Sequence, residues 1–376
     1  MRYTRREFAT LAAAGFPAAA LVGLDESIFS LPTDAKPNSL IGGVQVGTIT
    51  YSYRSMPDQS AEATLKYIVN SGISAIELMN GPAESFAGAP QSQRGSGGGR
   101  RGQPPTPEQQ AAQRESADRL RQWRTSVSMD RFKALRRLYN DAGVTIYAWK
   151  ALNPNMSDGE FEYVFNVAEA LGCTHTTLEL PTDVSQLKRV GAFAEKRKIY
   201  AAYHTHTQGS MTAFDQAFAV SKANMANVDL GHYVAGGGGN PIPFLEKFHD
   251  RIASFHLKDR TTPDHGAKNL PWGTGDTPLK QILQTVKKNR WTMPASIELE
   301  YEVPQGSDAV KEVARCLQFC RDAFDSAGPR RGGPPAANSP NVHRVGGSAF
   351  QPQRRMMSSD VNWWPRSRAR LQICAL

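Results

Sequence analysis

The chain has 376 residues, 40% of them hydrophobic, which is long enough to bury the core of one large domain or two average ones. Its formal net charge of +9 is unevenly distributed: residues 91–126 carry seven arginines and three acidic residues (+4), and residues 327–376 carry eight arginines and Asp360 (+7). The remainder is left with −2, which argues against a nucleic-acid-binding function, because proteins of that class present a basic surface on their folded body.

The first residues of the chain read MRYTRREFATLAAAGFPAAALVG. The pair Arg5 and Arg6, then Phe8, then an Ala-rich apolar stretch resemble a twin-arginine export signal. The apolar stretch is too short to span a bilayer stably. We therefore predict a signal peptide over residues 1–32, export to the periplasm and no stable membrane anchor. The alternative is an arginine pair that happens to precede an Ala-rich helix.

Short β-branched segments alternate with helical patterns along the middle of the chain. The predicted strands are VQVGTIT, SAIELMN, VTIYAWK, THTTLEL, IYAAYHT, ANVDLGH, IASFHLK and ASIELEY. The residues expected at helix ends are Ser128, Ser157 and Ser307 as N-caps and Gly72, Gly143 and Gly172 as C-caps. Eight such units over roughly 280 residues predict a single (β/α)8 TIM barrel at residues 40–326. A doubly wound open sheet is the alternative, but no GxGxxG motif follows the first strand.

Two segments fall outside this alternation. Residues 83–127 are predicted to be a low-complexity insertion after the second strand, and residues 327–376 a disordered basic tail. The Gly, Pro and Gln content of the basic stretches at 91–126 and in the tail favours disorder.

Ionisable side chains gather at the predicted carboxyl ends of the strands, which is where TIM barrels place their chemistry. In chain order they are Glu77, Lys150, Glu179, His204, His206, Asp229, His232, His256, Lys258, Glu298 and Glu300. Any one of them alone could be solvated or could cap the next helix. However, the fifth to eighth strands end in His, Asp, His and Glu, a set of nitrogen and oxygen ligands that suits a divalent ion such as Mn, Mg, Co or Zn.

Strand alternation supports a single site. In NVDL, SFHLK and SIELE the apolar residues are expected to face the helices, so Asp229, His256 and Glu298 point into the barrel from three neighbouring strands. Lys258 and Glu300 point inward by the same rule.

The motifs VDLGHY, SFHLKD and SIELEYE resemble those of the xylose-isomerase-like TIM-barrel family of sugar phosphate isomerases and epimerases, and the resemblance covers residues 44–323. In that family an Asp and a His of these motifs hold a divalent metal together with two carboxylates, which also move the proton. The resemblance implies that Asp229, His256 and Glu298 bind metal and that His232 binds a substrate hydroxyl.

One position departs from the family pattern. The fifth strand ends in AAYHTHTQ, with His204 where the family often has Glu. The second carboxylate is then either missing or supplied by Glu179 of the fourth strand, so we predict both Glu179 and His204 at the metal site, and Glu179 with Glu298 as the catalytic proton-transfer pair. The predicted substrate-binding residues are His206, His232, Lys258, Lys150 and Glu300.

These residues predict a reaction that starts by removing a proton next to a sugar carbonyl. A divalent ion polarises the carbonyl and stabilises the resulting enediolate. Return of the proton isomerises or epimerises the sugar, whereas loss of a β-substituent is the lyase alternative. Two further alternatives are an apurinic-endonuclease-like phosphodiesterase, which the charge of −2 disfavours, and a non-catalytic exported sugar-binding barrel. The expected partner is a small-molecule sugar and not nucleic acid, and homo-oligomer formation is left open.

Overall fold

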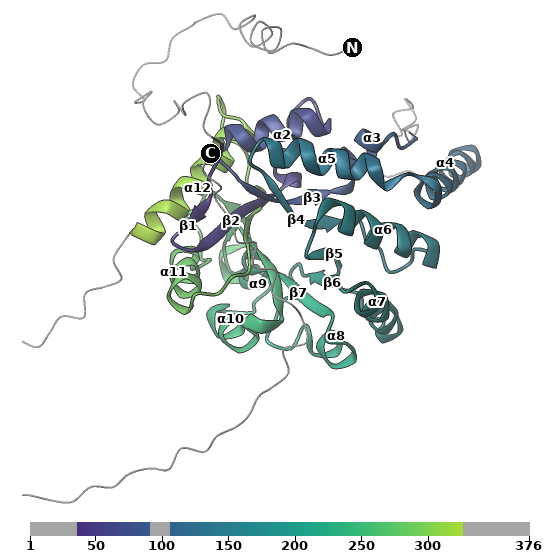
Figure 1. Ribbon diagram of the computed structural model, residues 1–376. Coiled ribbons are helices and arrows are strands. Elements are labelled where there is room, and N and C mark those ends of the chain that lie inside the picture. The colour runs from purple at the N-terminus through teal and green to yellow at the C-terminus, as the bar shows by residue number, and fades with distance from the viewer. Residues whose placement is uncertain (1–35, 91–105, 326–376) are drawn as a thin grey trace, which may run out of the picture. The chain divides into compact units, whose positions relative to one another are not determined.

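The computed structural model describes residues 36–90 and 106–325, so the predicted signal peptide and basic tail lie outside the described residues. Within that part, parallel strands close into a barrel, because β2 pairs with both β3 and β11 (Figure 1). In barrel order, the strands are β2 (Val44–Ile49), β3 (Ala75–Met79), β4 (Thr145–Lys150), β5 (His175–Glu179), β6 (Tyr200–His204), β7 (Asn224–Asp229), β8 (Ile252–Leu257) and β11 (Ala295–Ile297). The predicted TIM barrel is confirmed, and closure excludes the doubly wound open sheet.

Helices surround the strands (Figure 1). They are α2 (Ala61–Asn70), α3 (Asn80–Ala87), α4 (Pro107–Ser126), α5 (Met129–Asp141), α6 (Asp158–Leu171), α7 (Val184–Arg197), α8 (Asp215–Val220), α9 (Leu230–Ala235), α10 (Ile242–Phe248), α11 (Leu279–Asn289) and α12 (Ala309–Asp325). None of these helices in the described part of the chain is both long and apolar enough to cross a membrane.

Several short elements complete the described structure. The strand β1 (Leu40–Ile41) pairs antiparallel with β2, and β9 (Asp259–Arg260) pairs with β10 (Asn269–Leu270) in a hairpin that comes after β8. The 3-10 turns are η2 (Thr50–Tyr53), η3 (His249–Arg251) and η4 (Pro263–His265). The hairpin was not predicted, and it lies directly after the carboxyl end of β8.

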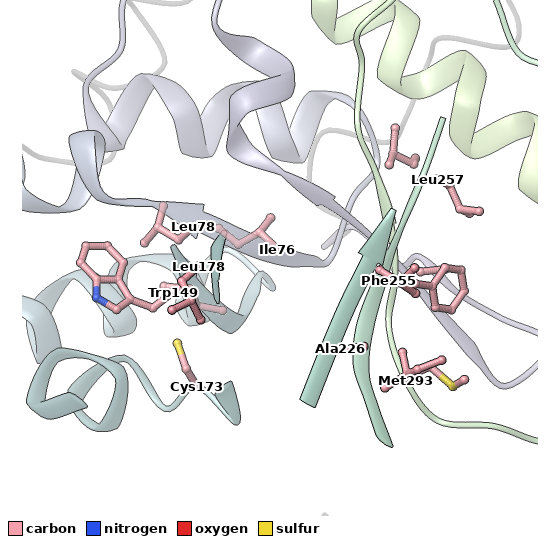
Figure 2. Packing of buried hydrophobic residues seen from close by; sticks show 14 of the residues in the cluster. Ile76, Leu78, Trp149, Cys173, Leu178, Ala226, Phe255, Leu257 and Met293 are labelled. Carbon is pink, nitrogen blue, oxygen red and sulfur yellow. The ribbon is translucent and has the colours of Figure 1, made fainter. Parts of the chain in front are cut away.

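The main core lies between the strands and the helices. Figure 2 shows Ile76 and Leu78 of β3 near Trp149, and Phe255 and Leu257 of β8 on the other side of the view; all five side chains are buried. Burial of each such side chain stabilises the fold by about 1.5–3 kcal/mol. Because side chains alternate along a strand, the residues between these apolar pairs face the barrel interior.

The predicted N-caps Ser128 and Ser157 and the predicted C-cap Gly172 are confirmed. Gly72 and Gly143 miss by one residue: the C-caps are Ser71 and Ala142, and each glycine follows its cap in the left-handed conformation. The prediction that Ser307 caps the last helix is wrong. Helix α12 begins at Ala309, and Asp308 caps it, because its Oδ1 accepts a hydrogen bond from the backbone N–H of Lys311 at 2.9 Å. The Ser307 hydroxyl instead donates to the buried carboxylate of Glu312.

The predicted disorder of residues 91–126 is wrong for its second half, where α4 forms a continuous helix. Thr106 and Gln109 form a capping box at its start, with hydrogen bonds of 3.3 and 2.9 Å, and Pro107 occupies the first turn. The Ala, Gln, Glu and Arg residues in the rest of the helix are good helix formers, a property that the low-complexity interpretation overlooked. Residues 91–105 lie outside the described residues.

A buried ion-pair cluster attaches α4 to the barrel. Arg124 Nε lies 2.9 Å from Glu84 Oε1 of α3, and Arg124 Nη1 lies 3.3 Å from Glu160 Oε1 of α6. Each of the three side chains is at most 10% exposed. Ion pairs that are largely shielded from solvent therefore hold the insertion helix α4 against α3 and α6.

Candidate metal centre at the mouth of the barrel

Four buried side chains meet at the carboxyl ends of the strands β6, β7, β8 and β11. They are His204, Asp229, His256 and Glu298, and one ligand atom from each lies within 4.8 Å of the others. The strands are consecutive neighbours in the barrel, with Asp229 directly opposite His256 in the β7–β8 register. We call these four residues the tetrad.

The eighth strand is shorter than predicted, since β11 ends at Ile297 and Glu298 comes directly after it. The backbone N–H of Glu298 still donates to the carbonyl oxygen of Leu257 at 3.0 Å. This bond keeps Glu298 aligned with β8 and places its carboxylate beside His256.

The distances within the tetrad are short. His256 Nδ1 lies 2.6 Å from Glu298 Oε2 and 4.0 Å from Asp229 Oδ2. Lys258 Nζ lies 3.0 Å from Asp229 Oδ2 and 3.1 Å from Glu298 Oε2. Asp229 Oδ2 is fully buried, and it is held by the ion pair with Lys258 rather than by a well-aligned hydrogen bond from a described residue. A buried carboxylate oxygen held in this way, beside two imidazoles and a second carboxylate, suits a divalent cation.

The second oxygen of Asp229 has a local role. Asp229 Oδ1 accepts a hydrogen bond of 2.7 Å from the backbone N–H of His232 and so caps α9. The cap fixes the carboxylate orientation, which leaves Oδ2 directed at the other ligands.

Burial and neighbouring charges perturb the ionisable groups of the tetrad. Burial opposes the charge on His256, but the carboxylates of Glu77 and Glu298 outweigh it and raise its pKa to about 10. Burial also opposes the charge on Glu298, but Lys258 and His256 hold its pKa well below the usual range. Burial, with help from His256, lowers the pKa of His204 to about 3, so His204 is a neutral imidazole with a lone pair available.

Glu179 lies outside the tetrad. Its side chain is 54% exposed, with Oε1 3.0 Å from Lys150 Nζ and Oε2 3.7 Å from His206 Nε2. It forms a second group of possible ligands with His204 and His206, again with ligand atoms within 4.8 Å of one another. The structure therefore places Glu179 at the border of the site, next to the histidine that replaces the expected carboxylate.

The other predicted substrate-binding residues form a rim above the tetrad. The rings of His206 and His232 lie 4.9 Å apart, and His232 Nε2 lies 3.7 Å from Glu300 Oε2. Glu300 in turn accepts a hydrogen bond of 2.7 Å from Lys258. Arg260 of the β9–β10 hairpin, which sequence reasoning missed, donates to His232 Nδ1. The sequence could have indicated Arg260, because it comes two residues after Lys258 and so continues the inward-facing series His256, Lys258.

Two buried polar residues lie among the tetrad histidines and were assigned no role from the sequence. Glu77 of β3 has its Oε2 atom 2.8 Å from His256 Nε2. Asn227 of β7 has its Oδ1 atom 2.9 Å from His204 Nδ1, and its Nδ2 atom donates to Glu77 Oε2. Burial raises the pKa of Glu77, but His256 overrides that effect and lowers the pKa to about 2. Asn227 precedes Asp229 by two residues, so strand alternation would have placed it inside the barrel.

Comparisons with known proteins agree with this architecture. A family model described as xylose isomerase-like TIM barrel matches residues 118–320, more than half of the chain. A comparison with curated protein sequences gives no match.

Solved structures resemble the barrel at low sequence identity. A xylose isomerase domain protein from Alicyclobacillus acidocaldarius aligns with a TM-score of 0.51 at 14% identity, over 75% of this chain and 100% of that one. The probable 3-DHS dehydratase AsbF from Bacillus anthracis gives 0.51 at 13% identity, over 73% and 98%. A xylose isomerase domain protein from Planctomyces limnophilus gives 0.50 at 15% identity, over 74% and 96%. At these identities the likeness concerns the fold alone.

Proposed function

Because this chain belongs to the xylose isomerase-like TIM barrel family, we propose that it is a divalent-metal-dependent sugar isomerase or epimerase. One observation carries the proposal: two imidazoles and two carboxylates, all buried, converge at the end of the barrel where this fold places its chemistry. His204, Asp229, His256 and Glu298 would hold the ion. When bound, the ion supplies Lewis-acid polarisation of the sugar carbonyl.

The residues around the tetrad supply binding and proton transfer. In our proposal, Glu298 and Glu179 exchange a proton with the carbon next to the carbonyl, because each of these carboxylates shares a group of possible ligands with His204, one buried and one exposed. Lys258, whose Nζ lies between Glu298 and Glu300, donates to the sugar oxygen on which negative charge develops. His206 and His232 orient the sugar hydroxyls at the rim.

The lyase alternative shares the first proton transfer. It differs only in the second step, in which a substituent on the β-carbon leaves instead of the proton returning. The two reactions are therefore separated by their products rather than by the residues that remove the proton.

Export to the periplasm would restrict the substrate. We propose that the chain is periplasmic and that its substrate is a free or oxidised sugar or a glycoside, since phosphorylated sugars are scarce outside the cytoplasm. Replacing both Arg5 and Arg6 with Lys should retain the protein in the cytoplasm, and unchanged export of that variant would contradict a twin-arginine route.

The test of the proposed activity begins with elemental analysis of the purified full-length protein. The metal-loaded protein is then incubated in D2O with a panel of unphosphorylated ketoses, aldoses and keto-glycosides, and the products are followed by NMR. Deuterium next to the carbonyl with an altered sugar supports the proposal, and an unsaturated product identifies the lyase reaction. A protein that binds no stoichiometric metal and exchanges no sugar proton would be a non-catalytic barrel, which contradicts the proposal. Asp229→Asn is the matched inactive control.

A further inference from the structure

We propose that Glu77 and Asn227 act together as a positioning pair that holds the two tetrad histidines in opposite tautomers, so that His256 offers Nδ1 and His204 offers Nε2 to the same ion. The inference rests on the metal centre of the proposed function. It goes beyond that function because it concerns two residues outside the tetrad and outside the proposed substrate-binding residues.

The first half of the pair is the carboxylate of Glu77. Its Oε1 accepts a hydrogen bond of 2.7 Å from Thr177 Oγ1, and its Oε2 accepts one of 3.2 Å from Asn227 Nδ2 and lies 2.8 Å from His256 Nε2. With three donors around its two oxygens, the carboxylate acts only as an acceptor, so His256 Nε2 must carry the proton of the shared hydrogen bond. The other ring nitrogen, Nδ1, lies 2.6 Å from Glu298 Oε2 and 4.0 Å from Asp229 Oδ2, so it also carries a proton when no ion is bound. An ion bound between these two carboxylates would take the place of that Nδ1 proton, whereas Glu77 keeps the proton on Nε2.

The second half of the pair is the amide of Asn227. Its Nδ2 donates to Glu77 Oε2 and to Ser254 Oγ at 2.7 Å, so both amide hydrogens are used. Its Oδ1 is therefore the atom that lies 2.9 Å from His204 Nδ1. Because an amide oxygen can only accept, His204 Nδ1 must carry a proton, and Nε2 keeps the lone pair.

The two bonds depend on each other through the contact between Glu77 and Asn227. Glu77 determines which way the Asn227 amide points, because only the NH2 group can approach the carboxylate. The same carboxylate determines the tautomer of His256. A ring with its proton on the wrong nitrogen would present N–H instead of a lone pair to the ion, and loss of such supporting hydrogen bonds typically weakens metal binding by about 10–100-fold.

Three variants of the full-length protein test the pair. Glu77→Leu removes the acceptor at similar volume, whereas Glu77→Gln keeps an oxygen that can accept from His256. Thr176→Val is the matched control, because the buried hydroxyl of Thr176 donates to the carbonyl oxygen of Trp149 and takes no part in the hydrogen bonds of Glu77 and Asn227. Mn2+ affinity is measured by electron paramagnetic resonance, and the ring tautomers are measured by NMR of Zn2+-loaded protein labelled with 15N-histidine.

We expect opposite tautomers for His204 and His256 in the wild type, a loss of Mn2+ affinity of about 10–100-fold in Glu77→Leu, and a smaller loss in Glu77→Gln with the wild-type tautomers retained. Thr176→Val should bind Mn2+ like the wild type. The inference is overturned if a folded Glu77→Leu protein keeps wild-type affinity and tautomers. If Glu77→Leu does not fold, the wild-type spectrum still decides, because like tautomers for the two rings contradict the pair. A wild type that binds neither ion overturns the proposed function as well, whereas metal binding that is insensitive to Glu77 overturns this inference only.

Discussion

The start of helix α9 approaches strand β8 so closely that a Cβ atom at Gly231 would lie 2.5 Å from the carbonyl oxygen of Lys258. Real side chains do not approach backbone at that distance, so the position requires glycine. The contact holds the segment that contains Asp229 and His232 against Lys258, the residue that follows the strand of His256. The glycine in VDLGHY therefore has a packing role in the site that the motif alone did not reveal.

A first prediction concerns this contact. Gly231→Ala should push α9 away from Lys258, destabilise the protein by about 1–3 kcal/mol and weaken metal binding. Gly81→Ala is the control, because a Cβ atom there meets no described atom within 4 Å and Gly81 lies in the helix α3. Urea denaturation and calorimetric titration with Mn2+ measure both effects. Equal behaviour of the two variants would show that the close approach has no consequence for the site.

A second prediction concerns the metal itself. His256→Ala should leave a folded barrel that purifies without stoichiometric metal, and its melting temperature should fall because the buried carboxylates of Glu77 and Glu298 lose their partner. His249→Ala is the control, since this exposed histidine stacks on Trp291 and contacts none of the tetrad residues. Elemental analysis and circular dichroism provide the measurements, and full metal occupancy in His256→Ala would remove this residue from the ligand set.

A third prediction separates the two candidate proton-transfer carboxylates. Glu298→Gln and Glu179→Gln should each lower turnover by roughly 10²–10⁴, the range expected for a lost general base. Only Glu298→Gln should also weaken metal binding strongly, because Glu298 belongs to the tetrad and Glu179 is exposed beside Lys150. Solvent deuterium exchange measures turnover. If Glu179→Gln retained full exchange, the site would use one carboxylate, and His204 would take the place assigned to Glu179.

A fourth prediction concerns the attachment of the insertion. Arg124→Met should destabilise the protein by about 3 kcal/mol or release α4 locally, because it leaves Glu84 buried without its cation and Glu160 with only the longer, 3.5 Å pair to Arg121. Arg119→Met should change stability by no more than about 0.5 kcal/mol, because its pair with Glu115 is exposed. Hydrogen exchange across α4 and urea denaturation compare the two variants, and similar protection of α4 in both would show that the buried cluster does not hold the helix.

A fifth prediction concerns the pH dependence of stability. Burial lowers the pKa of His175 from 6.5 to about 4, and the ring is hydrogen-bonded to Ser254 and Thr174 at 2.9 Å on both sides. Between those pH values the unfolded chain binds a proton that the folded chain does not, so stability present above pH 6.5 is lost as the pH falls through this window. The pKa values of His204 and His232 are lowered in the same direction.

His175→Gln should therefore reduce the loss of stability between pH 7 and pH 4 by an amount on the order of 1–3 kcal/mol. The part of the loss that is due to His204 and His232 should remain. Urea denaturation of both proteins in EDTA across this range is the measurement. A variant with the same pH slope as the wild type would mean that His175 is protonated in the folded state.

The strand order, the helices between the strands and the inward face of each strand were predictable from the sequence. They depend on local properties: the alternation in AIELM places Ile76 and Leu78 against helices and leaves Glu77 inside, and the same pattern aims Asp229 and His256 inward. The tetrad was predictable for a related reason, since consecutive strands of a closed parallel barrel are also neighbours in space.

Only the tertiary structure decided which of the inward residues touch. Glu77 meets His256 from a strand that is not its neighbour, across 179 positions of sequence, and Glu179 stays at the border although its strand lies beside that of His204. The helix α4 depends in the same way on Arg124 reaching two other helices. The curvature of the closed barrel and the packing of its side chains determine which of these hydrogen bonds and ion pairs can form. The periodicity of a single strand or helix specifies neither the curvature nor the packing.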